Sequence, residues 1–128
     1  MEIPQSWKNQ LASEVEKSYF LNLMQCVEKA YASENTNVFP SKELMFNAFE
    51  KCTFEATKVI VLGQDPYPTI GHANGLCFSV DALLKKLPKS LINIFKELQE
   101  DIKGSILSSG NLEPWAEQGV LLLNSALS

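Results

Sequence analysis

Two runs of apolar residues along the chain predict two short, buried strands. Residues 59–62 are four consecutive apolar residues, three of them β-branched, a pattern typical of a strand that is buried on both faces. Residues 120–123 are likewise four consecutive apolar residues and predict a second buried strand. A glycine at position 63 and two prolines shortly after it end the first strand, and Asp65 lies in that break. Asn124 follows the second strand directly.

Elsewhere, apolar residues recur every three or four positions and predict three helices. The first covers residues 13 to about 33 and begins at Ser13, which a glutamate follows at capping-box spacing. The second begins at Pro40, and the third begins with Ser90 as its N-cap and ends at Gly104. The core-facing positions are Phe20, Met24, Val27 and Tyr31 in the first helix, Leu44, Met45, Ala48 and Phe49 in the second, and Leu91, Ile94, Phe95, Leu98 and Ile102 in the third.

The segments between these elements are short. Residues 33–37 and 71–75 are polar and predict loops, and residues 105–111 predict a further loop. Residues 76–80 are apolar and are expected to be extended. Residues 112–117, which include a tryptophan, are expected to form one or two helical turns.

The order of strands and helices predicts an α/β fold. Parallel strands joined by right-handed helical crossovers end at the same edge of a sheet, so Asp65 and Asn124 are expected to project into one crevice. We expect a three-layer α/β/α arrangement with a short central parallel sheet, in a single domain over residues 1–128. Strands that are apolar on both faces need more neighbours than this chain supplies. We therefore expect the 128 residues to be the N-terminal part of a longer protein.

The composition fits a soluble globular protein, with 45% hydrophobic residues and no apolar run long enough for a membrane span. The N-terminus lacks the basic-then-apolar layout of a signal peptide. The net charge of −4 disfavours non-specific electrostatic binding of nucleic acid over a broad surface. A local site for a phosphate group is compatible with this charge. Cys26, Cys52 and Cys77 have no metal-like spacing and predict buried thiols in a reducing, cytoplasmic compartment.

The residues that suggest chemistry each have two interpretations. Asp65 either forms a turn before Pro66 or places a carboxylate in the ligand crevice. Asn124 is either a turn residue or a polar group that reads a ligand. Phe78 packs in the core or offers an aromatic face for stacking. Ser90 is a plain helix cap or a phosphate contact at a helix N-terminus.

Three ordered segments resemble the motifs of family 1 uracil-DNA glycosylase. They are Gly-Gln-Asp-Pro-Tyr at 63–67, Gly-Leu-Cys-Phe-Ser-Val at 75–80, and Trp-Ala-Glu-Gln-Gly-Val-Leu-Leu-Leu-Asn at 115–124. Weaker matches include Trp7 and residues 90–98. The resemblance covers nearly all of this chain but only a little over half of a typical family member.

The resemblance implies an enzyme of DNA base-excision repair that hydrolyses the N-glycosidic bond of deoxyuridine and releases uracil. Breaking this bond develops positive charge on the sugar, which a nearby carboxylate can stabilise while it orients or deprotonates the attacking water. The resemblance gives this role to Asp65. It implies no metal or cofactor, and a monomer that acts on single- or double-stranded uracil-containing DNA with no membrane partner.

The resemblance also assigns a base pocket. The amide of Asn124 would accept from uracil N3 and donate to uracil O4, and cytosine presents the opposite polarity at both atoms. Phe78 would stack on the flipped base, and Tyr67, stiffened by the prolines on either side, would exclude the methyl group of thymine. Gln64 would contact a base carbonyl through its backbone amide, and Ser90 would contact a DNA phosphate.

Some positions depart from the family pattern. Pro68 and Asn74 stand where many members have histidine, and His72 matches no family histidine, so we expect it to be a solvated loop side chain. A later His-Pro-Ser motif, whose histidine bonds the base, and a leucine wedge are not among these 128 residues. We therefore expect little or no activity from the chain alone.

The chain has two other interpretations. A nucleotide-phosphate-binding α/β domain would need Gly-x-x-x-x-Gly-Lys-Ser/Thr or Gly-x-Gly-x-x-Gly between a strand and a helix, and the sequence has neither in that context. A non-catalytic fragment or module that keeps the fold and binds DNA or protein is the second alternative. Binding without base release would distinguish it from an enzyme.

Overall fold

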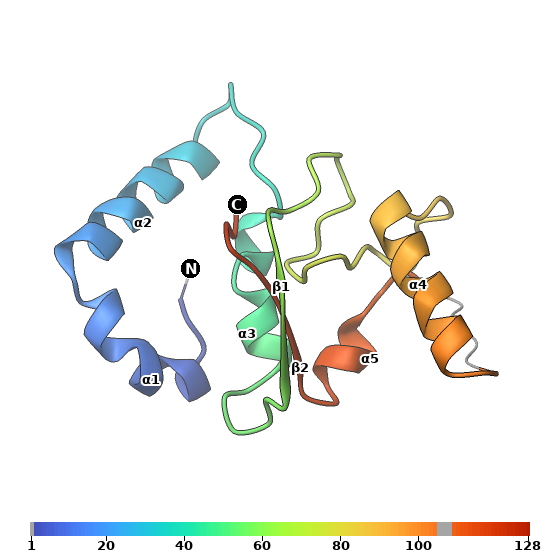
Figure 1. The fold of residues 1–128 in the computed structure, drawn as a ribbon. Helices are drawn as coiled ribbons and strands as arrows, with labels where there is room; N and C mark the ends of the chain where they lie inside the picture. The colour runs from blue at the N-terminus through green and yellow to red at the C-terminus, as the bar shows by residue number, and fades with distance from the viewer. Residues whose placement is uncertain (1, 105–108) are drawn as a thin grey trace.

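The computed structural model of the chain describes residues 2–104 and 109–128. Figure 1 shows its helices and strands in chain order. The elements are α1 (Gln5–Val15), α2 (Ser18–Tyr31), the 3₁₀ helix η1 (Lys42–Leu44), α3 (Asn47–Lys51), β1 (Val59–Gly63), α4 (Lys89–Asp101), α5 (Glu113–Ala116) and β2 (Val120–Asn124). The first four residues of the predicted loop at 105–111 lie outside the described residues.

The two strands form a parallel sheet, as the sequence predicts. Their register pairs Val59 with Val120 at one end and Gly63 with Asn124 at the other. The short helices α3 and α5 pack against β2. The described residues therefore form a mixed α/β fold with a two-stranded parallel sheet. Its buried apolar core includes Ala48, Cys52, Leu76, Cys77, Val80, Leu91, Leu112, Ala116, Leu121 and Leu122.

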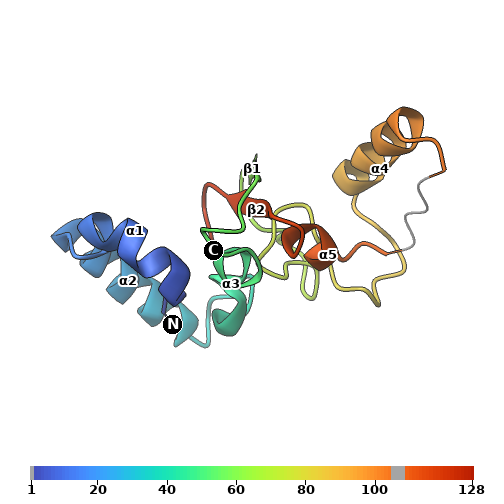
Figure 2. The ribbon, with the colours of Figure 1, turned by 90° about the horizontal axis from the view of Figure 1, so that it is seen from below.

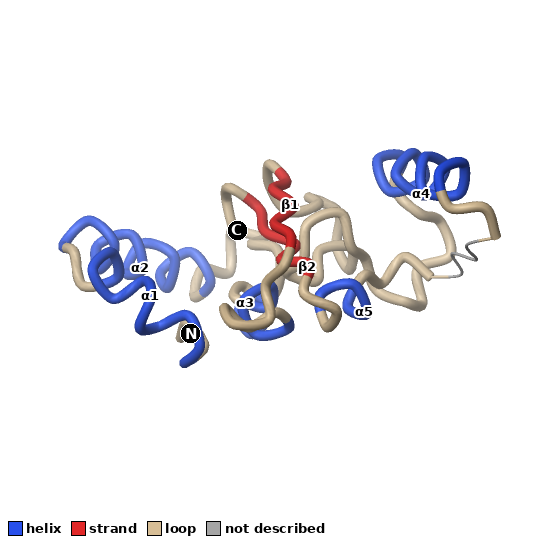
Figure 3. The backbone as a smooth tube through the Cα atoms, turned by 60° about the horizontal axis from the view of Figure 1, so that its bottom comes forward, coloured by secondary structure: helices blue, strands red, loops and turns tan. Residues whose placement is uncertain are grey.

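The sheet lies in the middle of an elongated arrangement. Figures 2 and 3 show the α1–α2 hairpin beyond one side of the strands and α4 beyond the other, with α3 and α5 close to the strands. The ends of β1 and β2 thus face loops from several parts of the chain, which is the geometry in which α/β proteins hold ligands.

The helix predicted over residues 13 to about 33 is confirmed for Ser18–Tyr31, which form α2, and is wrong for its start at residues 13–17. The chain leaves the helical conformation at Lys17, whose ψ is 145°, and α1 and α2 form a hairpin there. Ser13 therefore lies inside α1 and caps nothing. The physical reason is packing: Trp7 anchors α1 separately, since its indole N–H donates to Cys52 O over 2.8 Å and its ring packs against Phe49.

The second predicted helix is only partly helical. Residues 42–44 form the 3₁₀ turn η1, and α3 begins at Asn47. Met45, Ala48 and Phe49 are buried as predicted, whereas Leu44 is half-buried. The helical turns predicted at 112–117 are confirmed by α5.

The prediction that the first strand is buried on both faces is wrong. The exposed fraction is 53% for Val59, 63% for Ile60 and 63% for Leu62, although Leu121 and Leu122 in β2 are 2% and 1% exposed. The reason is the placement of the short helices. Within the described residues, both strands lie at an edge of the two-stranded sheet, but α3 and α5 pack against β2.

Residues 76–80 form a turn instead of the predicted extended segment. Phe78 has φ of 64°, in the left-handed region that non-glycine residues rarely adopt. The turn is held by the core: Cys77 N–H donates to Leu122 O over 3.0 Å, and the buried Ser79 hydroxyl accepts from Leu112 N–H over 2.9 Å. These long-range bonds override the local preference of an apolar run for a strand.

The predicted start of the third helix is wrong by two residues. α4 begins at Lys89 with Pro88 as its N-cap, so Ser90 lies within the first turn. A proline before the first turn is compatible with this start because its fixed φ suits the residue that enters a helix. Leu91 and Phe95 are buried as predicted, but α4 ends at Asp101, ahead of Gly104, and Ile102 is exposed.

The cysteines follow the prediction in part. Cys52 and Cys77 are buried free thiols, whereas Cys26 is exposed on α2, contrary to the expected burial. Within the described residues, no helix is both long and apolar enough to cross a membrane.

Candidate functional site

A cavity of about 180 Å³ lies where β1 and β2 end. It brings together every site residue proposed from the sequence. The residues that line it are Gly63, Gln64, Asp65, Pro66, Tyr67, Pro68, Ala73, Leu76, Phe78, Ser90 and Asn124. The sequence-based expectation that the two strand ends open into one crevice is therefore confirmed.

The segments after the two strands are tied together. Ser125 N–H donates to Gly63 O and Ala126 N–H donates to Gln64 O, both over 3.0 Å. Ser125 Oγ also donates to Gln64 O over 2.7 Å. These bonds fix the orientation of the peptide at Gln64 and hold Asn124 beside it.

Gly63 has no room for a side chain. A Cβ at this position would lie 2.7 Å from Cys77 Cβ and would collide with Asn124 Oδ1. The missing side chain therefore lets the Asn124 amide lie against the end of β1. This positions an amide, which both donates and accepts hydrogen bonds, at the wall of the cavity.

The hydroxyl of Tyr67 connects three walls of the cavity. It donates to Phe78 O over 3.2 Å and lies 2.9 Å from Ser90 Oγ. Because the tyrosine has one proton, the Ser90 hydroxyl is the donor in the second contact. Ser90 is thus turned toward Tyr67, and it makes no side-chain cap of α4.

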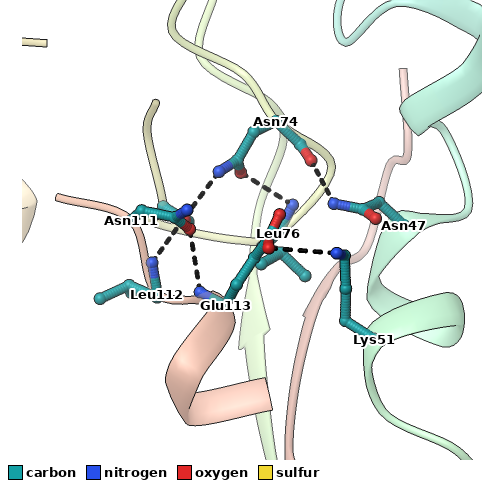
Figure 4. A network of polar contacts seen from close by, with 8 residues as sticks. Asn47, Lys51, Asn74, Leu76, Asn111, Leu112 and Glu113 are labelled. Carbon is teal, nitrogen blue, oxygen red and sulfur yellow. Dashed lines mark hydrogen bonds and ion pairs between the residues drawn. The ribbon is translucent and has the colours of Figure 1, made fainter. Parts of the chain in front are cut away.

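A network of polar contacts supports the turn that carries Phe78 (Figure 4). Asn47 Nδ2 donates to Asn74 O over 2.8 Å, and Asn74 Nδ2 donates to Ser79 Oγ over 2.9 Å. Asn74 Oδ1 accepts from Leu76 N–H over 3.3 Å. The ion pair between Lys51 and Glu113 lies beside this network and links α3 to α5.

Asp65 is exposed at the mouth of the cavity. Among the hydrogen bonds of residues 2–104 and 109–128, none involves its carboxylate. Asp81 behaves differently, since its Oδ1 accepts from Leu83 N–H over 2.8 Å and stabilises a turn. The carboxylate of Asp65 is therefore available to a ligand. The absence of a bond like that of Asp81 disfavours the interpretation of Asp65 as a turn-former.

Burial changes the acid–base behaviour of two groups beside the cavity. It raises the pKa of the Tyr67 phenol, which therefore stays a neutral hydroxyl donor at physiological pH. Burial also raises the pKa of the Cys77 thiol to about 11. Cys77 is thus a protonated thiol, and its Sγ lies 3.4 Å from Val61 O.

His72 lies near the cavity but outside its lining. Its ring is 6.2 Å from the Tyr67 ring, centroid to centroid, in an edge-on arrangement. The side chain is half-buried and so is less solvated than expected. In the part of the chain that the structure describes, no three His, Cys, Asp or Glu side chains gather in a way that could hold a metal ion.

A larger groove of about 800 Å³ runs along α2, with mainly apolar walls that include Ile3, Phe20 and Met24. Lys8 at its rim pairs with Glu2 over 3.4 Å. Polar side chains also line this groove, among them Lys8, Gln25 and Glu28.

Sequence reasoning missed several residues that build the site. The steric need for Gly63 and the bonds from Ser125 depend on the strand register, which the apolar runs alone do not reveal. Asn74 stood out only as a departure from a motif, yet it organises the turn around Phe78. A buried serine within an apolar run, Ser79, was the one sequence signal that could have pointed to a polar anchor.

The fold and the cavity define an α/β protein with a ligand crevice at the carboxyl ends of parallel strands. Proteins that are similar to this chain in sequence narrow this broad class of α/β proteins to one kind. The uracil-DNA glycosylase of Christiangramia forsetii is 54% identical over 126 residues, which are 98% of this chain and 56% of that relative. Uracil-DNA glycosylase 2 of Bacteroides fragilis is 49% identical over 128 residues, which are 100% of this chain and 57% of that relative.

Solved structures agree with the sequence relatives. The crystal structure of mimivirus uracil-DNA glycosylase superposes with a TM-score of 0.84 at 32% identity, over 95% of this chain and 46% of that one. No protein-family model matches the chain. The chain is a homologue of uracil-DNA glycosylases, and it spans about half the length of the relatives it matches.

Proposed function

We propose that this chain supplies part of the active site of a uracil-DNA glycosylase, which hydrolyses the N-glycosidic bond of deoxyuridine in DNA. The observation that carries the proposal is the single cavity lined by Gln64, Asp65, Tyr67, Phe78 and Asn124. Homology to enzymes of that name supports the substrate class. The site needs no metal or cofactor in this mechanism.

Asp65 is proposed to act on the sugar side of the bond. As the bond breaks, the sugar gains positive charge, and an ionised carboxylate at the cavity mouth stabilises that charge. The same carboxylate orients or deprotonates the attacking water. Its exposed position and unused oxygens leave it available for both tasks.

Asn124 and Phe78 are proposed to recognise the base after it leaves the DNA stack. The amide of Asn124, held against Gly63, accepts from uracil N3 and donates to uracil O4. Cytosine would leave both polar groups mismatched, at a cost of roughly 1–3 kcal/mol for each. The ring of Phe78 offers the stacking face, and its carbonyl is held by Tyr67.

Tyr67, Gln64 and Ser90 complete the proposed site. The tyrosine ring presses against C5 of uracil and excludes the methyl group of thymine. The backbone amide of Gln64 contacts a base carbonyl. The carbonyl of the same peptide unit, Gly63 O, accepts from Ser125 N–H, which fixes the direction of the Gln64 N–H. Ser90, in the first turn of α4, contacts a DNA phosphate through its hydroxyl or backbone.

We propose, further, that residues 1–128 form a single domain within a larger three-layer α/β/α fold, in a monomeric cytoplasmic enzyme. The homology to longer relatives supports this proposal.

By themselves, the 128 residues are expected to bind the base but to release little or no uracil from DNA. A histidine is absent from the described residues that line the cavity, so charge on the departing base has no imidazole donor there. Losing one such donor costs roughly 100- to 1000-fold in rate.

The test uses a chimera in which this chain is followed by the part of the Christiangramia forsetii relative that lies outside the matched 126 residues. The assay measures uracil released from a uracil-containing oligonucleotide. We expect release by the chimera, a drop of at least about 100-fold in Asp65→Asn, and no change in Asp101→Asn, a control at the end of α4. A chimera that binds uracil-containing DNA but releases no uracil would support a non-catalytic binding module.

A further inference from the structure

The backbone of Phe78 is held in a conformation that a residue with a bulky side chain does not favour. Its φ of 64° lies in the left-handed region, where such a residue is strained. Strain of this kind persists only where the surrounding structure imposes it, and it is concentrated at ligand sites. Phe78 lines the cavity at the strand ends. Some group near the cavity must therefore impose this conformation.

Asn74 holds both ends of the turn that carries Phe78. Its Oδ1 accepts from Leu76 N–H over 3.3 Å, and its Nδ2 donates to the hydroxyl of Ser79 over 2.9 Å. One bond thus reaches the residue two positions before Phe78, and the other reaches the residue directly after it. A single planar amide therefore clamps the turn.

The clamp is anchored to two other parts of the fold. Asn47, a buried residue of α3, donates from Nδ2 to Asn74 O over 2.8 Å. The buried Ser79 hydroxyl also accepts from Leu112 N–H over 2.9 Å. Figure 4 shows the contacts of Asn74 with Asn47 and Leu76. Moving the Asn74 amide would break bonds to buried groups, so the clamp is rigid enough to impose strain on the turn.

We propose that Asn74 is a positioning residue for base recognition, which keeps the ring of Phe78 in the orientation that stacks on uracil. This inference rests on the function proposed above. Asn74 is not among the residues that line the cavity, so it acts through Phe78 and not by contact with the base. A ring that is already in place needs no ordering when the base arrives, and the clamp therefore raises the affinity for uracil.

The experiment measures the dissociation constant of free uracil from the chimera described above, by isothermal titration calorimetry. Asn74→Leu removes both bonds of the clamp and keeps a side chain of similar shape. The dissociation constant should rise at least about 5-fold, because the stacking ring loses its fixed orientation. Circular dichroism checks that the variant folds, and Asn74→Ala serves in its place if it does not.

A second asparagine provides the matched control. Asn111 is half-buried, as Asn74 is, and its Oδ1 accepts from Glu113 N–H over 3.0 Å at the start of α5. Asn111→Leu should lower the free energy of unfolding because α5 loses this bond. It should leave the dissociation constant of uracil unchanged, since the bond does not hold the turn at Phe78.

A double-mutant cycle separates positioning from a general loss of structure. Phe78→Ala removes the stacking ring and should by itself weaken uracil binding. If Asn74 acts through this ring, Asn74→Leu should cause less than about a 2-fold further change in the Phe78→Ala background. A general loosening of the fold would weaken binding by the same factor in both backgrounds.

Asn74→Asp is the variant that should keep the clamp. Its carboxylate still accepts from Leu76 N–H. In the part of the chain that the structure describes, the Ser79 hydroxyl only accepts, so its own proton can turn toward that carboxylate. The dissociation constant of uracil should therefore stay within about 3-fold of the wild-type value.

Three results would overturn the inference and leave the proposed function standing. One is wild-type affinity for uracil in Asn74→Leu. Another is an equal loss of affinity with and without the Phe78 ring. The third is an Asn74→Asp variant that binds as weakly as Asn74→Leu, since the hydrogen bonds of the clamp would then not be the cause. A wild-type chimera that binds no uracil would overturn the proposed function together with this inference.

Discussion

Tyr67 donates a hydrogen bond from its hydroxyl to the carbonyl oxygen of Phe78 over 3.2 Å. This bond joins the loop after β1 to a turn whose central residue has a left-handed backbone. Ser90 Oγ, 2.9 Å from the same hydroxyl, ties the first turn of α4 to both. The hydroxyl oxygen of Tyr67 thus couples three parts of the cavity wall. These are the ring proposed to exclude thymine, the turn proposed to stack on the base, and the serine proposed to contact phosphate.

Tyr67→Phe should destabilise the protein while keeping the ring. It removes one donor and one acceptor, and the loss should lower the free energy of unfolding by roughly 1–2 kcal/mol. Denaturation in urea measures the change. Tyr19→Phe is the control, because its hydroxyl bonds to Glu14 at the surface and its removal should leave stability unchanged. Equal effects in the two variants would show that the Tyr67 hydroxyl does not couple the loops.

Ser79→Ala should be more harmful than its small size suggests. The buried hydroxyl accepts from Leu112 N–H and from Asn74 Nδ2, so its loss leaves two donors without a partner. The expected cost is roughly 1–3 kcal/mol in the free energy of unfolding. Ser33→Ala removes an exposed hydroxyl that bonds only nearby residues and should have little effect. A stable Ser79→Ala variant would mean that the network in Figure 4 does not hold the turn.

Gly63→Ala should disturb the strand ends through a steric clash. The added methyl group meets Cys77 Cβ and the Asn124 amide, and the overpacking should cost roughly 1–3 kcal/mol. Gly71→Ala is the comparison for the clash alone. Its φ of 77° strains any side chain, but no atom lies within 4 Å of the added methyl group. Nuclear magnetic resonance should show the Asn124 side-chain amide shifted in Gly63→Ala and unchanged in Gly71→Ala. An undisturbed Asn124 amide in Gly63→Ala would contradict the proposed packing.

Cys77 should make stability depend on pH in the alkaline range. Its folded pKa of about 11 lies above the ordinary value of 9.0, so folding favours the protonated thiol. The stabilisation is complete below pH 9 and is lost as the pH rises to 11, by up to about 3 kcal/mol.

The free-energy difference between the wild type and Cys77→Ala should therefore shrink between pH 9 and pH 11. Urea denaturation across that range measures it. Cys26→Ala, which removes a thiol at an exposed site, is the control variant. A constant difference for Cys77→Ala would indicate that the thiol ionises as it does in the unfolded chain.

The meeting of Asp65 and Asn124 could be predicted because it depends on local patterns. Two apolar runs of strand length with polar residues directly after them are visible in the sequence, and parallel pairing follows from a long helical connection. The site therefore formed where the sequence placed it. The same patterns could not tell which strand the short helices cover, and so the burial predicted for β1 is wrong.

The remaining errors have a common physical cause. The turn at Phe78 and the break at Lys17 depend on contacts far along the chain, such as Ser79 with Leu112 and Trp7 with Cys52. Local propensity is weaker than a few such long-range contacts. A helix start can also be mistaken where two polar residues follow a proline, as at Lys89 and Ser90.

The most direct test of the central claim is the single-turnover rate of uracil release by the chimera described above, compared with its Asp65→Asn variant on the same uracil-containing oligonucleotide. Both proteins must first be shown to fold and to bind the DNA equally well. If Asp65 stabilises the cationic sugar and activates water, the variant should be slower by at least about 100-fold. A rate that is unchanged in Asp65→Asn, or a folded chimera that releases no uracil, would contradict the account.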